Sequence, residues 1–197
     1  MSDTNQPTII AIAGSTRTGS WNGKVLAVAV EGAKAAGATV ELIDLAEYPM
    51  PLYNGDLEKE KGLPEHAARL QKKFKAVGGI LIAAPEYNSS ITPLLKNTID
   101  WLTRKGDGTG TLECFSGKVA GLISASQGAL GGLRSLRHVR EILGNIGVVV
   151  IPRQHAVTKV NELFDENGQT LKDEKTRTAL HAVAKDVVEM TRKVNGQ

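Results

Sequence analysis

The chain has 197 residues, of which 41% are hydrophobic and 23% charged, and its formal net charge is +3. This length favours one domain over residues 1–197, and so small a net charge does not indicate nucleic-acid binding. The one cysteine, Cys114, excludes an intrachain disulfide and a cysteine-based metal site. The N-terminus, MSDTNQP, is polar and does not show a signal-peptide pattern. No apolar run approaches the length of about 20 residues that a membrane-spanning helix needs. These two observations predict a cytoplasmic protein.

Short apolar runs alternate with helical patterns along the chain. Strands are expected at residues 8–14, 39–45, 78–84, 118–125 and 147–152. Helices are expected at residues 20–36, 64–76, 92–104, 131–145 and 171–194. Loops or turns are expected at residues 48–56, 105–110 and 165–170. This alternation predicts an α/β fold, a flavodoxin-like doubly wound sheet of five parallel strands in the order 2-1-3-4-5, with helices on both faces.

In such a sheet, ligands bind at the carboxyl ends of the strands, where the strand order reverses. The reversal falls between the first and third predicted strands. Three loops are therefore expected to meet at one crevice: residues 14–22, 85–91 and 124–132.

The first loop, GSTRTGSWN, opens a helix, so its unpaired backbone N–H groups and the helix dipole favour an anion. Ser15, Ser20 and Asn22 add neutral donors, and Arg17 adds a charged one. A nucleotide-hydrolysing Walker A loop is excluded, because Ser20 and Trp21 stand where lysine and Ser/Thr are required. The dinucleotide pattern GxGxxG is also absent. A terminal monophosphate fits best, and the alternative is a polar turn that binds nothing.

In the second loop, Pro85 ends a strand, and Glu86, Tyr87 and Asn88 then stand at the carboxyl end of the sheet. A planar heterocycle suits this position, while the alternative is an ordinary connection to a well-capped helix. Thr92 is expected to be the N-cap of that helix, with Pro93 at the first helical position. The third loop, SASQGALGG, has three glycines within five positions, which permit close backbone approach to a ring or a phosphate. The four histidines are far apart in the sequence and do not show the spacing of a metal site.

Three motifs in this order, GSxRxxSxN, PEYNxSxxxxLKNxIDW and GxxGGxR, resemble those of the NADPH-dependent FMN reductase family. Its members are flavodoxin-like quinone and azo-type reductases, and some are described as chromate reductases. The resemblance covers about residues 8–155. It implies non-covalently bound FMN, with NADPH or NADH as the hydride donor. The chain departs from the family at residues 91–94, Ile-Thr-Pro-Leu, where Pro-Gly is common, so the resemblance assigns no flavin contacts to residues 89–92.

Matched position by position, the resemblance assigns the phosphate loop to Ser15, Arg17, Ser20, Trp21 and Asn22. It assigns the wall beside the isoalloxazine ring to Pro85, Glu86, Tyr87 and Asn88. It assigns a third contact to Ser126 and Gly128. A homodimer or homotetramer with the flavin near a subunit interface is also implied, and candidates for that interface are Glu86, Tyr87, Arg134 and Arg137. No side chain is expected to act as a dedicated catalytic group, and no metal is expected.

The sequence is therefore interpreted as an FMN-dependent NAD(P)H oxidoreductase. Its acceptor would be a quinone-like or other oxidised small molecule, and chromate is one candidate. Two alternatives remain. One is a flavodoxin-type electron carrier, which the positive net charge disfavours because such carriers tend to be acidic. The other is a flavin-bound redox sensor.

Overall fold

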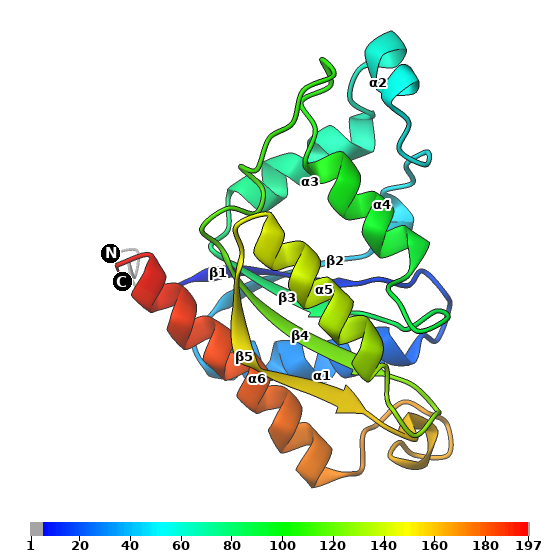
Figure 1. Ribbon diagram of the computed structural model, residues 1–197. Helices are drawn as coiled ribbons and strands as arrows, with labels where there is room; N and C mark the ends of the chain where they lie inside the picture. Colours follow the sequence, from blue (N-terminus) through cyan, green and yellow to red (C-terminus); the bar gives the residue numbers. More distant parts are fainter. Residues whose placement is uncertain (1–5, 197) are drawn as a thin grey trace.

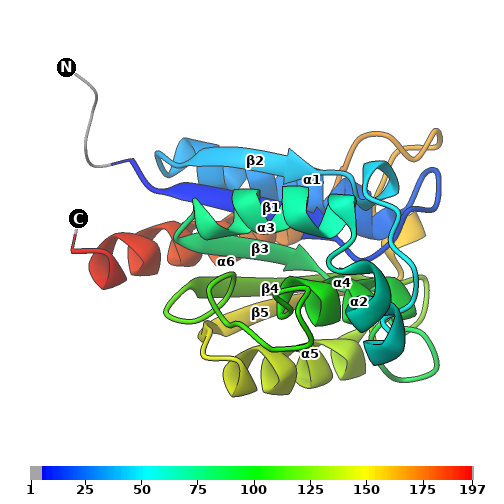
Figure 2. The same ribbon diagram turned by 90° about the horizontal axis from the view of Figure 1, so that it is seen from above.

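The computed structural model describes residues 6–196; residues 1–5 and 197, with most of the polar N-terminal stretch, lie outside the described residues. Five parallel strands form one sheet in the order β2-β1-β3-β4-β5 (Figure 1, Figure 2). The strands are β1 (Thr8–Ala13), β2 (Thr39–Ile43), β3 (Gly79–Ala83), β4 (Val119–Ala125) and β5 (Val149–Val157). The predicted fold class and strand order are confirmed.

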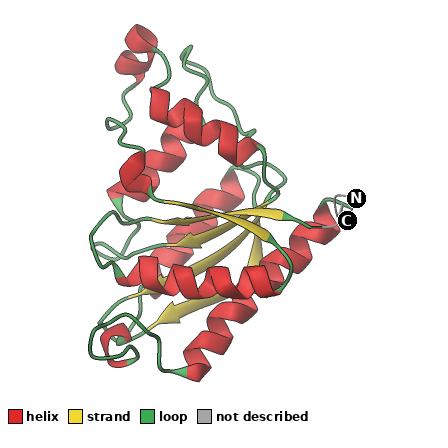
Figure 3. Ribbon diagram, turned by 180° about the vertical axis from the view of Figure 1, so that it is seen from behind, coloured by secondary structure: helices red, strands yellow, loops and turns green. Residues whose placement is uncertain are grey.

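Helices cover both faces of this sheet (Figure 1, Figure 3). They are α1 (Trp21–Ala35), α2 (Gly55–Lys61), α3 (Glu65–Lys75), α4 (Pro93–Leu102), α5 (Leu133–Asn145) and α6 (Glu174–Val194). One core cluster joins the sheet to α1 and α6, and a second joins its other face to α3, α4 and α5. From residue 6 to residue 196, no helix combines the length and the apolar character that crossing a lipid bilayer requires.

The central strands are almost entirely apolar because they are covered on both sides. Every residue of β3 and of β4 is buried. Strand β2 lies at the edge of the sheet, and its Leu42 is 57% exposed. The core thus holds β1, β3 and β4 in fixed register, and their carboxyl ends meet at one edge, from which the three predicted loops leave.

Strand β5 is longer than predicted, since it continues past Pro152 to Val157. The register between β4 and β5 shifts between Ala120 and Leu122, so the proline sits at an irregularity where it need not donate a ladder hydrogen bond. Arg140 on α5 donates to the carbonyls of Val150 (3.2 Å) and Ile151 (2.9 Å). The sequence prediction ended the strand at the proline. Arg140, which binds the carbonyls just before it, comes from a separate helix, and local sequence does not reveal that contact.

Two helix predictions also need correction. Helix α2 was not predicted: its sequence, GDLEKEK, has no apolar stripe, and its first residues fall in the segment assigned to a loop. It is held by the buried carboxylate of Glu58, which accepts from Arg104 Nε (2.9 Å), Tyr53 Oη (3.1 Å) and Gly106 N (3.2 Å). Helix α6 begins at Glu174 instead of residue 171, because Asp173 caps it by accepting from the backbone N–H of Thr176.

Candidate functional site

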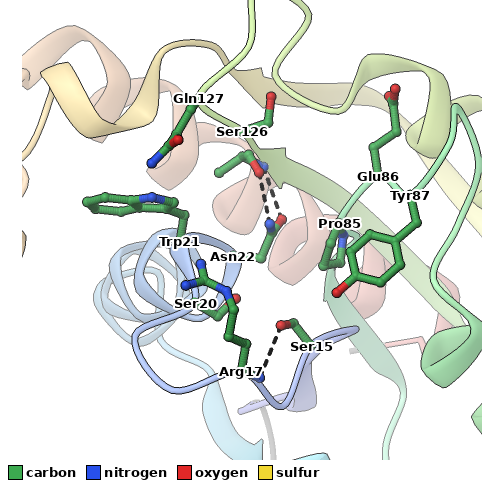
Figure 4. Close-up of a pocket in the computed structure, with 11 residues that line it drawn as sticks. Ser15, Arg17, Ser20, Trp21, Asn22, Pro85, Glu86, Tyr87, Ser126 and Gln127 are labelled. Carbon is green, nitrogen blue, oxygen red and sulfur yellow. Dashed lines mark hydrogen bonds between the residues drawn. The ribbon is translucent and has the colours of Figure 1, made fainter.

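A cavity of about 320 Å³ opens at the carboxyl ends of β1, β3 and β4, where the strand order reverses (Figure 4). Its volume lies at the lower end of the range usual for small-molecule sites. It is lined by Ser15, Arg17, Ser20, Trp21, Asn22, Pro85, Glu86, Tyr87, Ala125, Ser126 and Gln127. Nine of the eleven residues predicted to bind a cofactor are in this lining, so the three loops meet as expected; Asn88 and Gly128 are outside it.

The first loop leads into α1 without a side-chain cap. Ser20 is the N-cap residue, but its hydroxyl accepts no hydrogen bond from the helix, and the first turn contains no acidic residue. The N-terminal N–H groups of α1 therefore need another partner. Ser15 and Ser20 add hydroxyls beside them, and Arg17 is exposed, with no carboxylate within ion-pair distance among residues 6–196. These groups form a set of donors suited to an anion.

Asn22 lines the same cavity, but its carboxamide is already engaged. Its Nδ2 donates to the carbonyl of Ala125 (2.9 Å), and its Oδ1 accepts from the N–H of Ala125 (3.0 Å). Both residues are buried. The assignment of Asn22 to the phosphate loop stays a prediction; in the structure its amide joins the start of α1 to the end of β4.

The second loop is attached to α5 through Glu86. This carboxylate accepts from the backbone N–H groups of Arg134 (3.1 Å) and Ser135 (3.4 Å), and from Arg134 Nε (2.7 Å). Burial alone would raise the pKa of Glu86, but the hydrogen bonds from Arg134 and Ser135 outweigh it and hold the pKa below its usual value. Ser135 Oγ also donates to the carbonyl of Pro85 (3.0 Å). The cavity wall is thus fixed, and its one carboxylate is neutralised by an arginine.

Tyr87 is 55% exposed at the mouth of the cavity, where its hydroxyl points toward the side formed by Ser15 (Figure 4). Tyr87 and Ser90 exchange two backbone hydrogen bonds, each of 3.0 Å. Asn88 and Ser89 between them both have positive φ, 48° and 69°, as in a type I′ turn. Asn88 therefore lies at the tip of a turn and not in the lining.

The third loop contributes Ala125, Ser126 and Gln127 to the lining. Of these three residues only Ser126 was predicted. Ala125 and Gln127 are its two neighbours in the sequence, and this adjacency is the signal that could have identified them. Gly128 is exposed and lies outside the lining, and its carbonyl accepts from the N–H groups of Gly131 (3.3 Å) and Lys159 (3.2 Å).

A hydroxyl joins the first two loops. Thr92 Oγ1 donates to the carbonyl of Gly14 (2.7 Å) and accepts from the N–H of Leu95 (3.2 Å). The prediction that Thr92 caps α4, with Pro93 at the first helical position, is confirmed. The departure from the usual family pattern at residues 91–94 thus supplies a contact that fixes the first loop.

The residues present fit FMN. The uncapped end of α1 offers hydroxyl, backbone and guanidinium donors to a terminal phosphate. Pro85 and Tyr87 line the opposite side, where a flat ring can pack. The only acidic lining residue, Glu86, is ion-paired with Arg134.

Residues 7–162 match the sequence model of the family described as NADPH-dependent FMN reductase. The chain belongs to this family. The resemblance read from the three motifs is therefore confirmed, and with it the class of enzyme, FMN as the cofactor and NAD(P)H as the donor that define the family.

Individual relatives agree with this assignment. The chain is 34% identical over 166 residues to an NAD(P)H-dependent FMN reductase of Pseudomonas aeruginosa, which covers 84% of this chain and 85% of that one. It is 33% identical over 194 residues to an NAD(P)H:quinone oxidoreductase of Solanum tuberosum, covering 96% and 95%. Among solved structures, the flavoenzyme FerB of Paracoccus denitrificans, an NAD(P)H:(acceptor) oxidoreductase, superimposes with a TM-score of 0.77 at 27% identity, covering 95% and 98%.

Proposed function

We propose that this member of the FMN reductase family binds FMN in the cavity at the end of the sheet and transfers electrons from NAD(P)H to quinones. The observation that carries the proposal is the uncapped N-terminus of α1, which lies at the strand reversal with Ser15, Arg17 and Ser20 beside it. Neither an acidic residue in the first turn nor a side-chain cap competes with a phosphate there.

Bound FMN would supply the redox chemistry between NAD(P)H and the acceptor. The chain's own residues bind and orient. Ser15, Ser20 and the first N–H groups of α1 hold the phosphate, and Arg17 balances its charge. Pro85 and Tyr87 form the wall beside the ring and leave the cavity open to solvent on the side of the exposed tyrosine.

The acceptor is proposed to be a quinone because a relative in Escherichia coli is named quinone reductase and one in Solanum tuberosum is named NAD(P)H:quinone oxidoreductase. An open cavity at which Tyr87 is half-exposed also suits acceptors of varied shape. Chromate stays a prediction, as do a cytoplasmic location and a single domain over residues 1–197.

A homodimer or homotetramer is proposed as well, and the surface of α5 supports it. Arg137 and Glu141 lie one turn apart on α5 beside a second cavity of about 320 Å³, and neither has an ion-pair partner among residues 6–196. In a two-fold interface with antiparallel α5 helices, each would meet its opposite charge on the second copy. Leu130 and Leu133 nearby are 47% and 42% exposed. Arg137→Glu should dissociate the assembly in light scattering, and adding Glu141→Arg should restore it.

An absorbance spectrum of the purified protein in the near-ultraviolet and visible range tests the main proposal, followed by anaerobic addition of NADPH and then a quinone. Flavin bands that bleach with NADPH and return with the quinone are expected. Bands that persist with both NADPH and NADH would favour the electron carrier or the sensor. A protein without bands that also takes up no FMN on titration would overturn the proposal.

A further inference from the structure

A short hairpin follows the part of the chain that matches the family, which ends at residue 162. In this hairpin segment, residues 163–172, Phe164 and Leu171 form an antiparallel bridge. The N–H of Lys172 donates to the carbonyl of Leu163 (2.8 Å), and two further backbone bonds close the loop between them. The sequence predicted only a turn at residues 165–170, and the structure shows a fold of its own around that turn.

The hairpin segment packs against Trp21. The rings of Phe164 and Trp21 have centroids 5.2 Å apart at an interplanar angle of 52°. Lys24 places its ammonium 4.6 Å from the centroid of the same indole, and that ammonium also donates to the carbonyl of Gly168. A Cβ added to Gly168 would lie 3.2 Å from Trp21 Cη2 and 3.2 Å from Lys24 Nζ, so the backbone of the hairpin passes directly against the pair.

Trp21 has a particular position in the candidate site. It is the first residue of α1, directly after the N-cap Ser20, and it lines the cavity (Figure 4). Because Ser20 makes no side-chain cap, local hydrogen bonding does little to hold the first turn of α1 in place. Packing on the indole adds a constraint beside that of the Asn22 amide, and it leaves the N–H groups free.

The stretch just before the hairpin is hydrogen-bonded to the third loop. The N–H of Lys159 donates to the carbonyl of Gly128 (3.2 Å), and the N–H of Val160 donates to the carbonyl of Ser126 (3.1 Å). Residues 159–172 therefore contact both the phosphate side and the third loop of the cavity, and they join two loops that lie far apart in the sequence.

We propose that the hairpin segment is a positioning element for FMN: by holding Trp21 through Phe164 and Gly168, it pre-organises the start of α1 for the phosphate. The inference rests on the proposed function, because it assumes that FMN occupies this cavity. It adds residues outside the cavity lining, and largely outside the region matched by the family, to those that determine cofactor affinity. A pre-organised binding loop loses less conformational freedom on binding, which raises affinity.

Two matched pairs of variants test the proposal. Phe164→Leu is compared with Phe115→Leu, since Phe115 is also a buried aromatic, 5.8 Å from Phe74 in the core cluster on the other face of the sheet. Gly168→Ala is compared with Gly117→Ala. Both glycines have positive φ, 62° and 76°, but a Cβ on Gly117 would meet no atom within 4 Å. Within each pair the substitution is the same, and only the first variant changes a residue that lies against Trp21.

The dissociation constant of FMN is measured by titration of the flavin-free protein, with unfolding free energies alongside. Phe164→Leu and Gly168→Ala should weaken FMN binding about tenfold, while the control variants stay within about twofold of the parent. Equal affinities within each pair would overturn the proposal.

A second measurement needs no flavin. In a Trp101→Phe background, Trp21 is the only tryptophan, because the chain contains two. Quenching of its fluorescence by acrylamide should increase in the flavin-free Phe164→Leu variant and not in Phe115→Leu; unchanged quenching would show that the hairpin does not hold Trp21. If the parent protein takes up no FMN, the proposed function fails, and quenching still decides whether the hairpin holds the indole. If the parent binds FMN and all variants bind equally, only the present inference fails.

Discussion

Substitution of Asn22 by alanine should destabilise the fold and weaken FMN binding together. The carboxamide makes two hydrogen bonds with the backbone of Ala125, of 2.9 and 3.0 Å, and both residues are buried, with exposed fractions of 5% and 4%. Removing it leaves one buried N–H and one buried carbonyl without a partner, each costing about 1–3 kcal/mol. A loss of about 2–6 kcal/mol in the free energy of unfolding is expected.

Asn97→Ala is the matched control. Asn97 also donates to and accepts from the backbone of another segment, with Nδ2 on the carbonyl of Pro51 (2.9 Å) and Oδ1 accepting from the N–H of Tyr53 (2.8 Å). It is only half-buried and lies outside the cavity lining, so water can replace its contacts and the cost should be about 1–2 kcal/mol.

Urea unfolding of both flavin-free variants, followed by FMN titration, separates the two effects. Asn22→Ala should weaken FMN binding about tenfold, because the start of α1 is no longer fixed to β4, whereas Asn97→Ala should bind FMN as the parent does. A loss of stability below about 1 kcal/mol for Asn22→Ala would refute the argument, since two buried backbone groups would then have been left unpaired without cost.

Three further predictions concern charge. Arg17→Ala should raise the dissociation constant of FMN about 10- to 100-fold at unchanged stability, as expected for the loss of one charge-assisted contact to a phosphate. The control Arg153→Ala should not change this constant. Unchanged affinity in Arg17→Ala would contradict the assignment of Arg17 to the phosphate. Burial alone would raise the pKa of Glu58, but hydrogen bonds from Arg104 and other donors hold it below its usual value. The stability that Glu58 contributes is therefore present above the ordinary carboxyl pKa and is lost as pH falls through the lowered pKa. Glu58→Gln should flatten the acid side of the curve of unfolding free energy against pH. An unchanged curve would exclude a contribution of the Glu58 carboxylate to acid unfolding. Burial raises the pKa of Cys114 to about 11, so a thiol reagent at neutral pH should label the unfolded protein much faster than the native one; rapid native labelling would contradict the burial.

The sheet was predictable because each of its signals is local. Apolar runs such as residues 78–84 specify strands buried on both faces, and their alternation with helical patterns specifies a doubly wound order. The order then places three loops at one edge, so nine of the eleven predicted site residues line the cavity. Thr92 was also predictable, because a threonine before proline is a local start signal for a helix.

The features that were missed depend on contacts between distant segments. Helix α2 follows no apolar pattern and is held by Glu58 against Arg104, 46 residues away in the sequence. The continuation of β5 past Pro152 requires Arg140 from a helix. From the sequence alone, the side-chain amide of Asn22 has no evident partner, and only in the folded chain does it form hydrogen bonds with the backbone of Ala125. Local pattern thus placed the loops, but it did not show what each side chain within them contacts.

Leaving donors free for an anion makes other groups necessary to hold the loops. Three polar side chains that face protein hold the loops: Thr92 bonds Gly14 of the first loop, Asn22 bonds Ala125 of the third loop, and Glu86 attaches the second loop to the start of α5. A second set, Ser15, Ser20 and Arg17, faces the cavity and holds no other loop by a side-chain hydrogen bond among residues 6–196. Substitutions in the first set should lower stability and cofactor affinity together, because the loops themselves move. Those in the second set should lower affinity alone. Cofactor affinity in this fold is therefore set as much by the contacts between loops as by the groups that touch the phosphate.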